Sequence, residues 1–120
     1  MGKDFTKQEE AFAELLNIME TLREKCPWDH KQTMESLRTL SVEEVYELGD
    51  AILKNDMQEV KKELGDLLMH IVFYALIGKE QEQFDMTDVL NEICAKLRYR
   101  HPHIYGEVKV EDEKDRKSVV

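Results

Sequence analysis

The chain has 120 residues, of which 42% are hydrophobic and 36% are charged, and its formal net charge is −9. This length allows one domain with a real core and leaves little room for a second. The acidic balance argues against a nucleic-acid polymer as partner, because duplex binding depends on basic surface. An acidic protein can still bind a polyphosphate if divalent cations lie between the two sets of negative charge.

The composition narrows the class of protein further. Five glycines and two prolines are few, which favours helices over a many-stranded protein. The longest apolar run, residues 67–77, is interrupted by His70 and is too short to cross a bilayer. Two cysteines and no signal-like apolar start lead us to expect a reduced, cytoplasmic protein with no membrane partner. The spacing of Cys26 and His30 is a weak zinc signal, since no second cysteine pair is nearby.

Apolar residues recur at helical spacing almost throughout the chain, which predicts an all-α fold of four to five helices. The first helix is expected over about residues 6–23. A proline within residues 26–29 should interrupt it, and helix should resume near Thr33. Ser41 and Glu44 have the spacing of a capping box, which predicts a kink or a new helix start at that point.

The second half of the chain shows similar punctuation. Residues 54–56 indicate a short turn whose last residue caps the next helix. That helix is expected to be long, from about residue 57 to about residue 80. Asp85 then signals a last helix over about residues 86–100, which a proline soon after it should stop.

The C-terminal end differs in character from the helical part. Residues 107–120 are charged and carry no apolar stripe, so we expect a flexible tail after a helical domain at residues 1–106. Four or five helices do not easily enclose so many apolar faces by themselves. We therefore expect a helical bundle that is completed by dimerisation.

Two of the expected helices place carboxylates on the side that should face other helices. At about 100° per residue, Glu44 falls inside the apolar arc of its helix and Glu47 lies on the rim of that arc. On the next helix Glu63 and Asp66, again three residues apart, lie on the apolar side. Glu43 falls on the polar face, where an acidic residue is ordinary.

Inward carboxylates need compensation, because a buried unpaired charge is costly and several of them repel one another. A divalent cation, a buried salt-bridge network and simple exposure at the rim all remain open from the spacing. Among cations magnesium suits four carboxylates, because it prefers oxygen ligands and keeps waters that phosphate oxygens can replace. His70 shares this face, where a packed or hydrogen-bonded histidine is more common than a ligand.

These carboxylates belong to a longer pattern that resembles the MazG family. Glu43-Glu44-x-x-Glu47 and Glu63-x-x-Asp66 resemble the two acidic motifs of that family. Three further stretches agree with it: Cys26-Pro27-Trp28-Asp29 with Gln32-Thr33, then Phe84-Asp85, then the run from Lys96 to His103. The resemblance covers about residues 9–110, and the order and spacing of its motifs make it specific.

MazG-like proteins are all-helical nucleoside triphosphate pyrophosphohydrolases that cut between the α and β phosphates. The resemblance implies a requirement for Mg²⁺, with Mn²⁺ as a substitute, and a homodimer or homotetramer. Carried over by position, the metal ligands would be Glu44, Glu47, Glu63 and Asp66. Of these, Glu44 and Glu47 would also be catalytic, and the substrate would be contacted by Lys96, Arg100, Trp28 and Glu43.

Some of these roles also have a simpler explanation. Lys96 and Arg100 are four residues apart, so they share a helical face that suits either a phosphate clamp or a solvated basic patch. Trp28 would either stack on a base or pack beside the neighbouring proline. Glu47 is the candidate for taking a proton from the attacking water. Longer relatives continue into a helix with Trp and Lys, so we expect those contacts to be missing here or supplied differently.

Three other functions compete with this one. A related enzyme of narrower specificity, dUTPase-like or of the phosphoribosyl-ATP type, would share the same motifs. A non-catalytic helical dimerisation module would pair the acidic residues with Lys and Arg across an interface. A carboxylate-bridged di-iron bundle needs Glu-x-x-His on two helices, and that pattern does not occur in this sequence.

Overall fold

A computed structural model describes residues 2–106 of the chain, and every regular element in that part is a helix. The helices are α1 (Thr6–Lys25), α2 (Pro27–Lys31), α3 (Met34–Leu53), α4 (Met57–Glu80), α5 (Met86–Arg100) and α6 (Pro102–Tyr105). The predicted all-α class is confirmed. The expected tail at 107–120 lies outside the described residues. No helix in the described part is both long and apolar enough to cross a membrane.

The ends of the long helices follow the cap signals in the sequence. Thr33 and Asp85 each form a capping box with the residue three positions further on. The Asp56 side chain accepts a hydrogen bond from the Glu59 backbone N–H at 3.2 Å. Such caps satisfy N–H groups at a helix start that have no acceptor within the helix. The helices α3, α4 and α5 therefore begin where the sequence predicts.

The structure differs from the predicted elements in two places. Pro27 and Pro102 each follow the end of one helix and begin a short second one. The fixed φ of proline suits the first position of a helix. The kink or new start predicted at Ser41 was wrong, since α3 is continuous there. The Ser41 hydroxyl instead donates to the Leu37 carbonyl one turn back, at 3.1 Å, an option open to a serine inside a helix.

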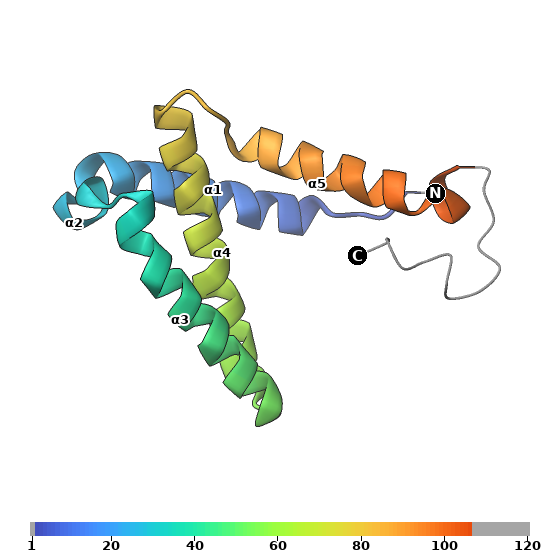
Figure 1. Cartoon of the computed structure of the whole chain (residues 1–120), viewed down its shortest axis with the longest axis horizontal. Coiled ribbons are helices and arrows are strands. Elements are labelled where there is room, and N and C mark those ends of the chain that lie inside the picture. Colours follow the sequence, from blue (N-terminus) through green and yellow to red (C-terminus); the bar gives the residue numbers. More distant parts are fainter. Residues whose placement is uncertain (1, 107–120) are drawn as a thin grey trace.

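The helices form a crossing with two projections (Figure 1). The helices α3 and α4 lie antiparallel and project as a hairpin from the place where α4 crosses α1. The buried core lies at this crossing and consists of Met19, Leu37, Val72, Phe73 and Ile77. Helix α5 leaves the end of α4 as a separate arm and has no buried residue. The radius of gyration, 17.7 Å, accordingly exceeds the ~13 Å typical of a compact chain of this size.

One arginine fastens the crossing. Arg23 of α1 is 15% exposed, and its Nε and Nη2 donate to the two carboxylate oxygens of Glu80 at 2.7 and 2.8 Å. Its Nη1 donates to three backbone carbonyls around α2, those of Asp29, His30 and Gln32. The guanidinium also lies 5.6 Å from the centre of the Phe73 ring, within cation–π range. Arg23 thus joins α1, α2 and α4.

Two helices carry apolar stripes that the described chain does not cover. The stripe residues follow helical spacing and are 39–52% exposed on α4 and 42–44% exposed on α5; they are Leu64, Leu68 and Ile71, and Leu90, Ile93 and Leu97. Extended apolar surface of this kind marks an interaction site. The hairpin and the arm therefore each present a face suited to packing against another helix.

Candidate metal centre

Three carboxylates converge between α3 and α4. One oxygen each from Glu44, Glu63 and Asp66 lies within 4.8 Å of the other two. Glu63 is 1% exposed, and the other two side chains are half-buried. The two helices are antiparallel neighbours, so the inward phase of Glu44 on α3 meets that of the acidic pair on α4. Such a group of close oxygens is one that a hard cation binds.

A fourth carboxylate lies at the edge of this group. Glu47 is exposed, yet it comes within hydrogen-bonding reach of Glu63. Beside them is a hollow of about 460 Å³, whose lining is mainly charged and includes Glu47, Asp50, Lys54, Glu59, Lys62 and Glu63. The buried Glu63 can therefore be reached from solvent on the Glu47 side.

The carboxylates disfavour one another's charge. Burial, followed by the charges of Asp66 and Glu63, raises the pKa of Glu44, and His70 and Lys62 oppose this rise. The hydrogen bond with Glu47, followed by desolvation, raises the pKa of Glu63. The Oε2 atom of Glu44 is buried and has no hydrogen-bond partner among the described residues. A buried carboxylate oxygen in that position needs a proton or a cation.

One basic side chain reaches the group from the rim. The Lys62 Nζ lies 3.3 Å from Glu63 Oε1 and 3.6 Å from Asp66 Oδ2. The Lys62 side chain is 62% exposed, so water screens these ion pairs. One flexible ammonium group also does not balance four carboxylates. Lys62 was not among the residues predicted for the site, although its i, i+4 spacing to Asp66 is the signal that reveals such a pair.

Behind the carboxylates lies a hydrogen-bonded histidine. His70 is 6% exposed, and its Nδ1 lies 2.9 Å from the Ser41 Oγ. The same Oγ lies 2.5 Å from the Tyr74 hydroxyl. His70 therefore matches the more common of its two expected roles, and it does not belong to the group of three carboxylates.

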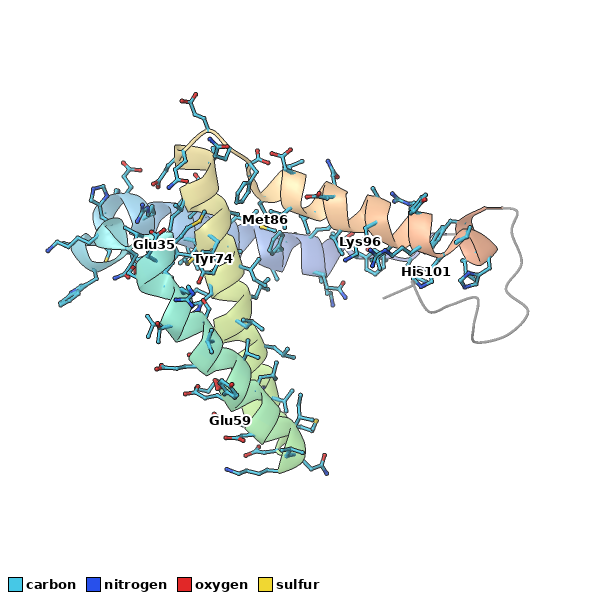
Figure 2. The ribbon with its side chains drawn as sticks, viewed as in Figure 1. Glu35, Glu59, Tyr74, Met86, Lys96 and His101 are labelled. Atoms are coloured by element: carbon cyan, nitrogen blue, oxygen red, sulfur yellow. The ribbon has the colours of Figure 1, made fainter. Side chains whose placement is uncertain are left out.

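The other predicted site residues lie elsewhere in the chain. Lys96 is exposed and Arg100 half-buried on α5, and Figure 2 shows Lys96 out along that arm, away from the hairpin that carries Glu59. Trp28 of α2 is 79% exposed, so it is not a packing plug within this chain. Glu43 is exposed on α3. Within residues 2–106, the α5 arm and the carboxylates of the hairpin lie on separate projections.

Comparison with known families bears on this arrangement. The sequence model of the family described as MazG nucleotide pyrophosphohydrolase domain matches residues 32–105, more than half of the chain. The chain belongs to the MazG family. The resemblance read from its motifs is therefore confirmed, and all four carboxylates fall within the matched part of this MazG domain.

Curated MazG relatives are similar over most of the chain. A nucleoside triphosphate pyrophosphohydrolase of Escherichia coli K12 is 40% identical over 104 residues, which are 84% of this chain and 40% of the relative. A nucleoside triphosphate pyrophosphohydrolase/pyrophosphatase MazG of Thermotoga maritima is 47% identical over 98 residues, 80% of this chain and 38% of the relative. This MazG domain thus spans about two fifths of the length of these relatives.

A solved structure shares the fold. The crystal structure of a MazG-related protein from Thermotoga maritima matches with a TM-score of 0.75 and 28% sequence identity. The match covers 89% of this chain and 94% of that chain. The crossing, the hairpin and the arm therefore correspond to an architecture that is already known within the family.

Proposed function

We propose that this MazG domain hydrolyses nucleoside triphosphates to a nucleoside monophosphate and pyrophosphate, with Mg²⁺ held by its carboxylates. The observation that carries the proposal is the buried Oε2 of Glu44, which has no hydrogen-bond partner in the described part of the chain and whose carboxylate faces those of Glu63 and Asp66. The names of the E. coli and T. maritima relatives support the same reaction.

The donor set fits a hard divalent cation. The three grouped side chains offer only carboxylate oxygens, which magnesium and manganese prefer over softer metals. Glu44, Glu63 and Asp66 would hold the ion, and Glu47 would join them from the rim. Lys62 is long and mostly exposed, so it can move aside at little cost when a cation binds.

The expected reaction breaks the bond between the α and β phosphates. A bound Mg²⁺ would supply neutralisation of the triphosphate charge and polarisation of the phosphoryl oxygens. Glu47 lines the hollow and is exposed there, so it is placed to accept a proton from the attacking water. Glu44 would take part in the reaction through the cation that it holds. Pyrophosphate then leaves and the monophosphate remains.

The phosphates also need positive partners, and the described residues that line the hollow include only two basic ones, Lys54 and Lys62. Lys96 and Arg100 belong to α5, which projects as an arm away from the hairpin (Figure 1). We propose that a second copy of the chain places its α5 over the hairpin, so that these two residues steady the phosphates in trans. The uncovered apolar stripes of α4 and α5 support this assembly, because each needs a partner surface. A homodimer or homotetramer would satisfy both, and light scattering would distinguish them.

The proposed base contact is Trp28. Its ring is 79% exposed, and an exposed indole offers a face on which any nucleobase can stack. Glu43, the first glutamate of the α3 motif, is exposed and is proposed to contact the substrate as well. Trp28 is the only tryptophan, so a nucleotide that stacks on it would change the intrinsic fluorescence of the protein. An unchanged spectrum at saturating nucleotide would remove Trp28 from the site.

The test is pyrophosphate release from a panel of canonical and damaged nucleoside triphosphates in the presence of Mg²⁺. Glu44→Gln keeps the shape of the side chain and is expected to lower kcat/KM by ~100-fold or more. The matched control is Glu35→Gln, an exposed glutamate at the start of the same helix (Figure 2), which should keep full turnover. A folded Glu44→Gln with undiminished turnover would exclude the assignment. The panel also separates a broad activity from a dUTPase-like or phosphoribosyl-ATP specificity.

The ion pairs of Lys62 favour one other candidate, a non-catalytic dimerisation module in which basic residues neutralise the carboxylates. Calorimetry with Mg²⁺ and with a non-hydrolysable triphosphate separates the two. The module would bind neither ligand, whereas the enzyme binds both.

A further inference from the structure

A hydrogen-bonded polar network lies in the seam between α3 and α4, next to the carboxylates. Its centre is the Ser41 Oγ, which contacts the His70 Nδ1 at 2.9 Å, the Tyr74 hydroxyl at 2.5 Å and the Leu37 carbonyl at 3.1 Å. Ser41 precedes Glu44 by three residues on α3, and His70 follows Asp66 by four on α4. One helical turn therefore separates the network from the carboxylates on both helices.

The three contacts of Ser41 form a complete hydrogen-bond set in one arrangement. A serine hydroxyl has one hydrogen to donate and two lone pairs to accept with. The Leu37 carbonyl can only accept, so the Ser41 hydrogen goes to it. Ser41 then accepts from the Tyr74 O–H and from the His70 Nδ1–H, which assigns the hydrogen on that ring to Nδ1. A single hydroxyl of α3 thus holds two side chains of α4.

The adjoining carboxylate layer acts in the opposite direction. Glu44 on α3 faces Glu63 and Asp66 on α4 across a gap in which like charges repel. On the far side of this layer the helices are joined by the short turn at residues 54–56. On the near side the cross-helix bonds of Ser41 hold them together, close to the crossing at which Figure 2 places Tyr74. The network therefore lies where it can influence the spacing of the carboxylates.

We propose that Ser41, His70 and Tyr74 are positioning residues that fix α3 against α4, so that Glu44, Glu63 and Asp66 converge on a divalent cation. This inference rests on the proposed function for the identity of that ligand. None of the three residues touches the substrate in it; they act through Glu44. Substitution of outer residues that orient metal ligands typically costs ~10–100-fold in metal affinity or activity.

The experiment is calorimetric titration of the full chain with Mn²⁺, with kcat and KM for the metal as a second readout. Ser41→Ala removes the common acceptor of His70 and Tyr74 and is expected to weaken Mn²⁺ binding ~10-fold. At saturating metal its kcat should stay close to that of the wild type. Ser41→Thr keeps the hydroxyl and should restore the affinity. Equal affinity of Ser41→Ala and the wild type would overturn the proposal.

A second serine of α3 supplies the control. Ser36→Ala removes a hydroxyl of the capping box at the helix start, away from the seam, so it should lower thermal stability and leave Mn²⁺ affinity unchanged. An equal loss of affinity in Ser36→Ala would mean that any loosening of α3 has this effect, which also overturns the proposal. If Ser41→Ala does not fold, Tyr74→Phe removes one donor and keeps the ring, and unchanged affinity in it overturns the proposal equally. A wild-type chain that binds no Mn²⁺ would instead defeat the proposed function itself.

Discussion

The two charged clusters of this protein differ in how completely their charges are satisfied. At the crossing, Arg23 makes five hydrogen bonds, three to backbone carbonyls and two to Glu80. In the hairpin, Glu44 has a buried oxygen with no hydrogen-bond partner within residues 2–106, and its nearest charged neighbours include two more carboxylates. The same helix, α4, contributes Glu80 to the first cluster and Glu63 to the second. The bonds of Arg23 show that this fold can provide hydrogen-bond partners for a charged side chain. The first cluster links three helices, whereas the second brings together carboxylates whose charges repel one another.

The largest expected effect comes from Glu63→Gln in the hairpin. The glutamine removes one charge and can donate a hydrogen bond to Glu47, so the repulsion in the seam falls. We expect turnover to fall ~100-fold or more, since a ligand of the cation is lost. In EDTA the melting temperature should rise above that of the wild type. Both quantities are measured on one preparation, by pyrophosphate release and thermal unfolding. A lower melting temperature with turnover retained would show that Glu63 has a structural role like that of Arg23.

The next effect comes from Arg23→Met at the crossing, and its pattern should be the reverse. Methionine keeps the apolar stem but leaves three carbonyls and Glu80 without their donor, which is expected to cost ~3 kcal/mol of unfolding free energy. Turnover per folded molecule should not change. Urea unfolding measures the first quantity and an active-site titration the second. The control Arg38→Met, at an exposed position of α3, should stay within ~0.5 kcal/mol of the wild type.

The same contrast explains how far the sequence predicts the fold. The bounds of α4 and α5 followed from local signals, since Asp56 and Asp85 cap the helices that the apolar spacing indicates. The prediction at Ser41 failed because its capping-box spacing competes with two partners on α4. Those partners lie 29 and 33 residues away in the chain, and local spacing does not reveal them.

The candidate site shows the same division between local and distant information. The grouping of Glu44, Glu63 and Asp66 followed from helical phase, because two helices that adjoin in the chain turned their carboxylates toward each other. The proposed approach of Lys96 to these carboxylates could not be predicted in this way. Lys96 lies on an arm that points away from the hairpin. Its approach to the carboxylates therefore depends on a second chain, and helical phase within one chain does not predict how two chains pack.

Acid should affect the two clusters in opposite directions, with a smaller effect than either substitution. Burial and the neighbouring carboxylates raise the pKa of Glu44 above its ordinary 4.5, and the hydrogen bond with Glu47 together with burial raises that of Glu63. A raised pKa means that the folded state binds protons more tightly, so this contribution is complete below 4.5 and is lost as the pH rises through the raised values. In EDTA the melting temperature should therefore increase as the pH falls from 7 toward 5.

The crossing responds with the other sign and in a lower pH range. The hydrogen bonds from Arg23 lower the pKa of Glu80 below 4.5, so its contribution is present above 4.5 and is lost as the pH falls through the lowered value. Melting curves across this range should show a maximum that Glu63→Gln flattens on its high-pH side and Arg23→Met flattens on its low-pH side. A monotonic curve in the wild type, or no change in either variant, would contradict the assignment of the two slopes.

The smallest expected effect is that of Lys62→Met. It tests whether Lys62 neutralises the carboxylates of the hairpin as Arg23 neutralises Glu80 at the crossing. If it only occupies the rim, Lys62→Met should change the stability in EDTA by less than ~1 kcal/mol, because its ammonium is screened by water. Mn²⁺ binding should then tighten by up to ~3-fold, since a competing positive charge is removed. If Lys62 is the intended counter-ion, the variant should lose stability on the scale of Arg23→Met, because four carboxylates would then face one another without their cation. Calorimetry and urea unfolding of this variant thus decide between two explanations of the excess negative charge in the seam. Either the carboxylates are the binding site of a cation, or Lys62 is their counter-ion in ion pairs that water weakens.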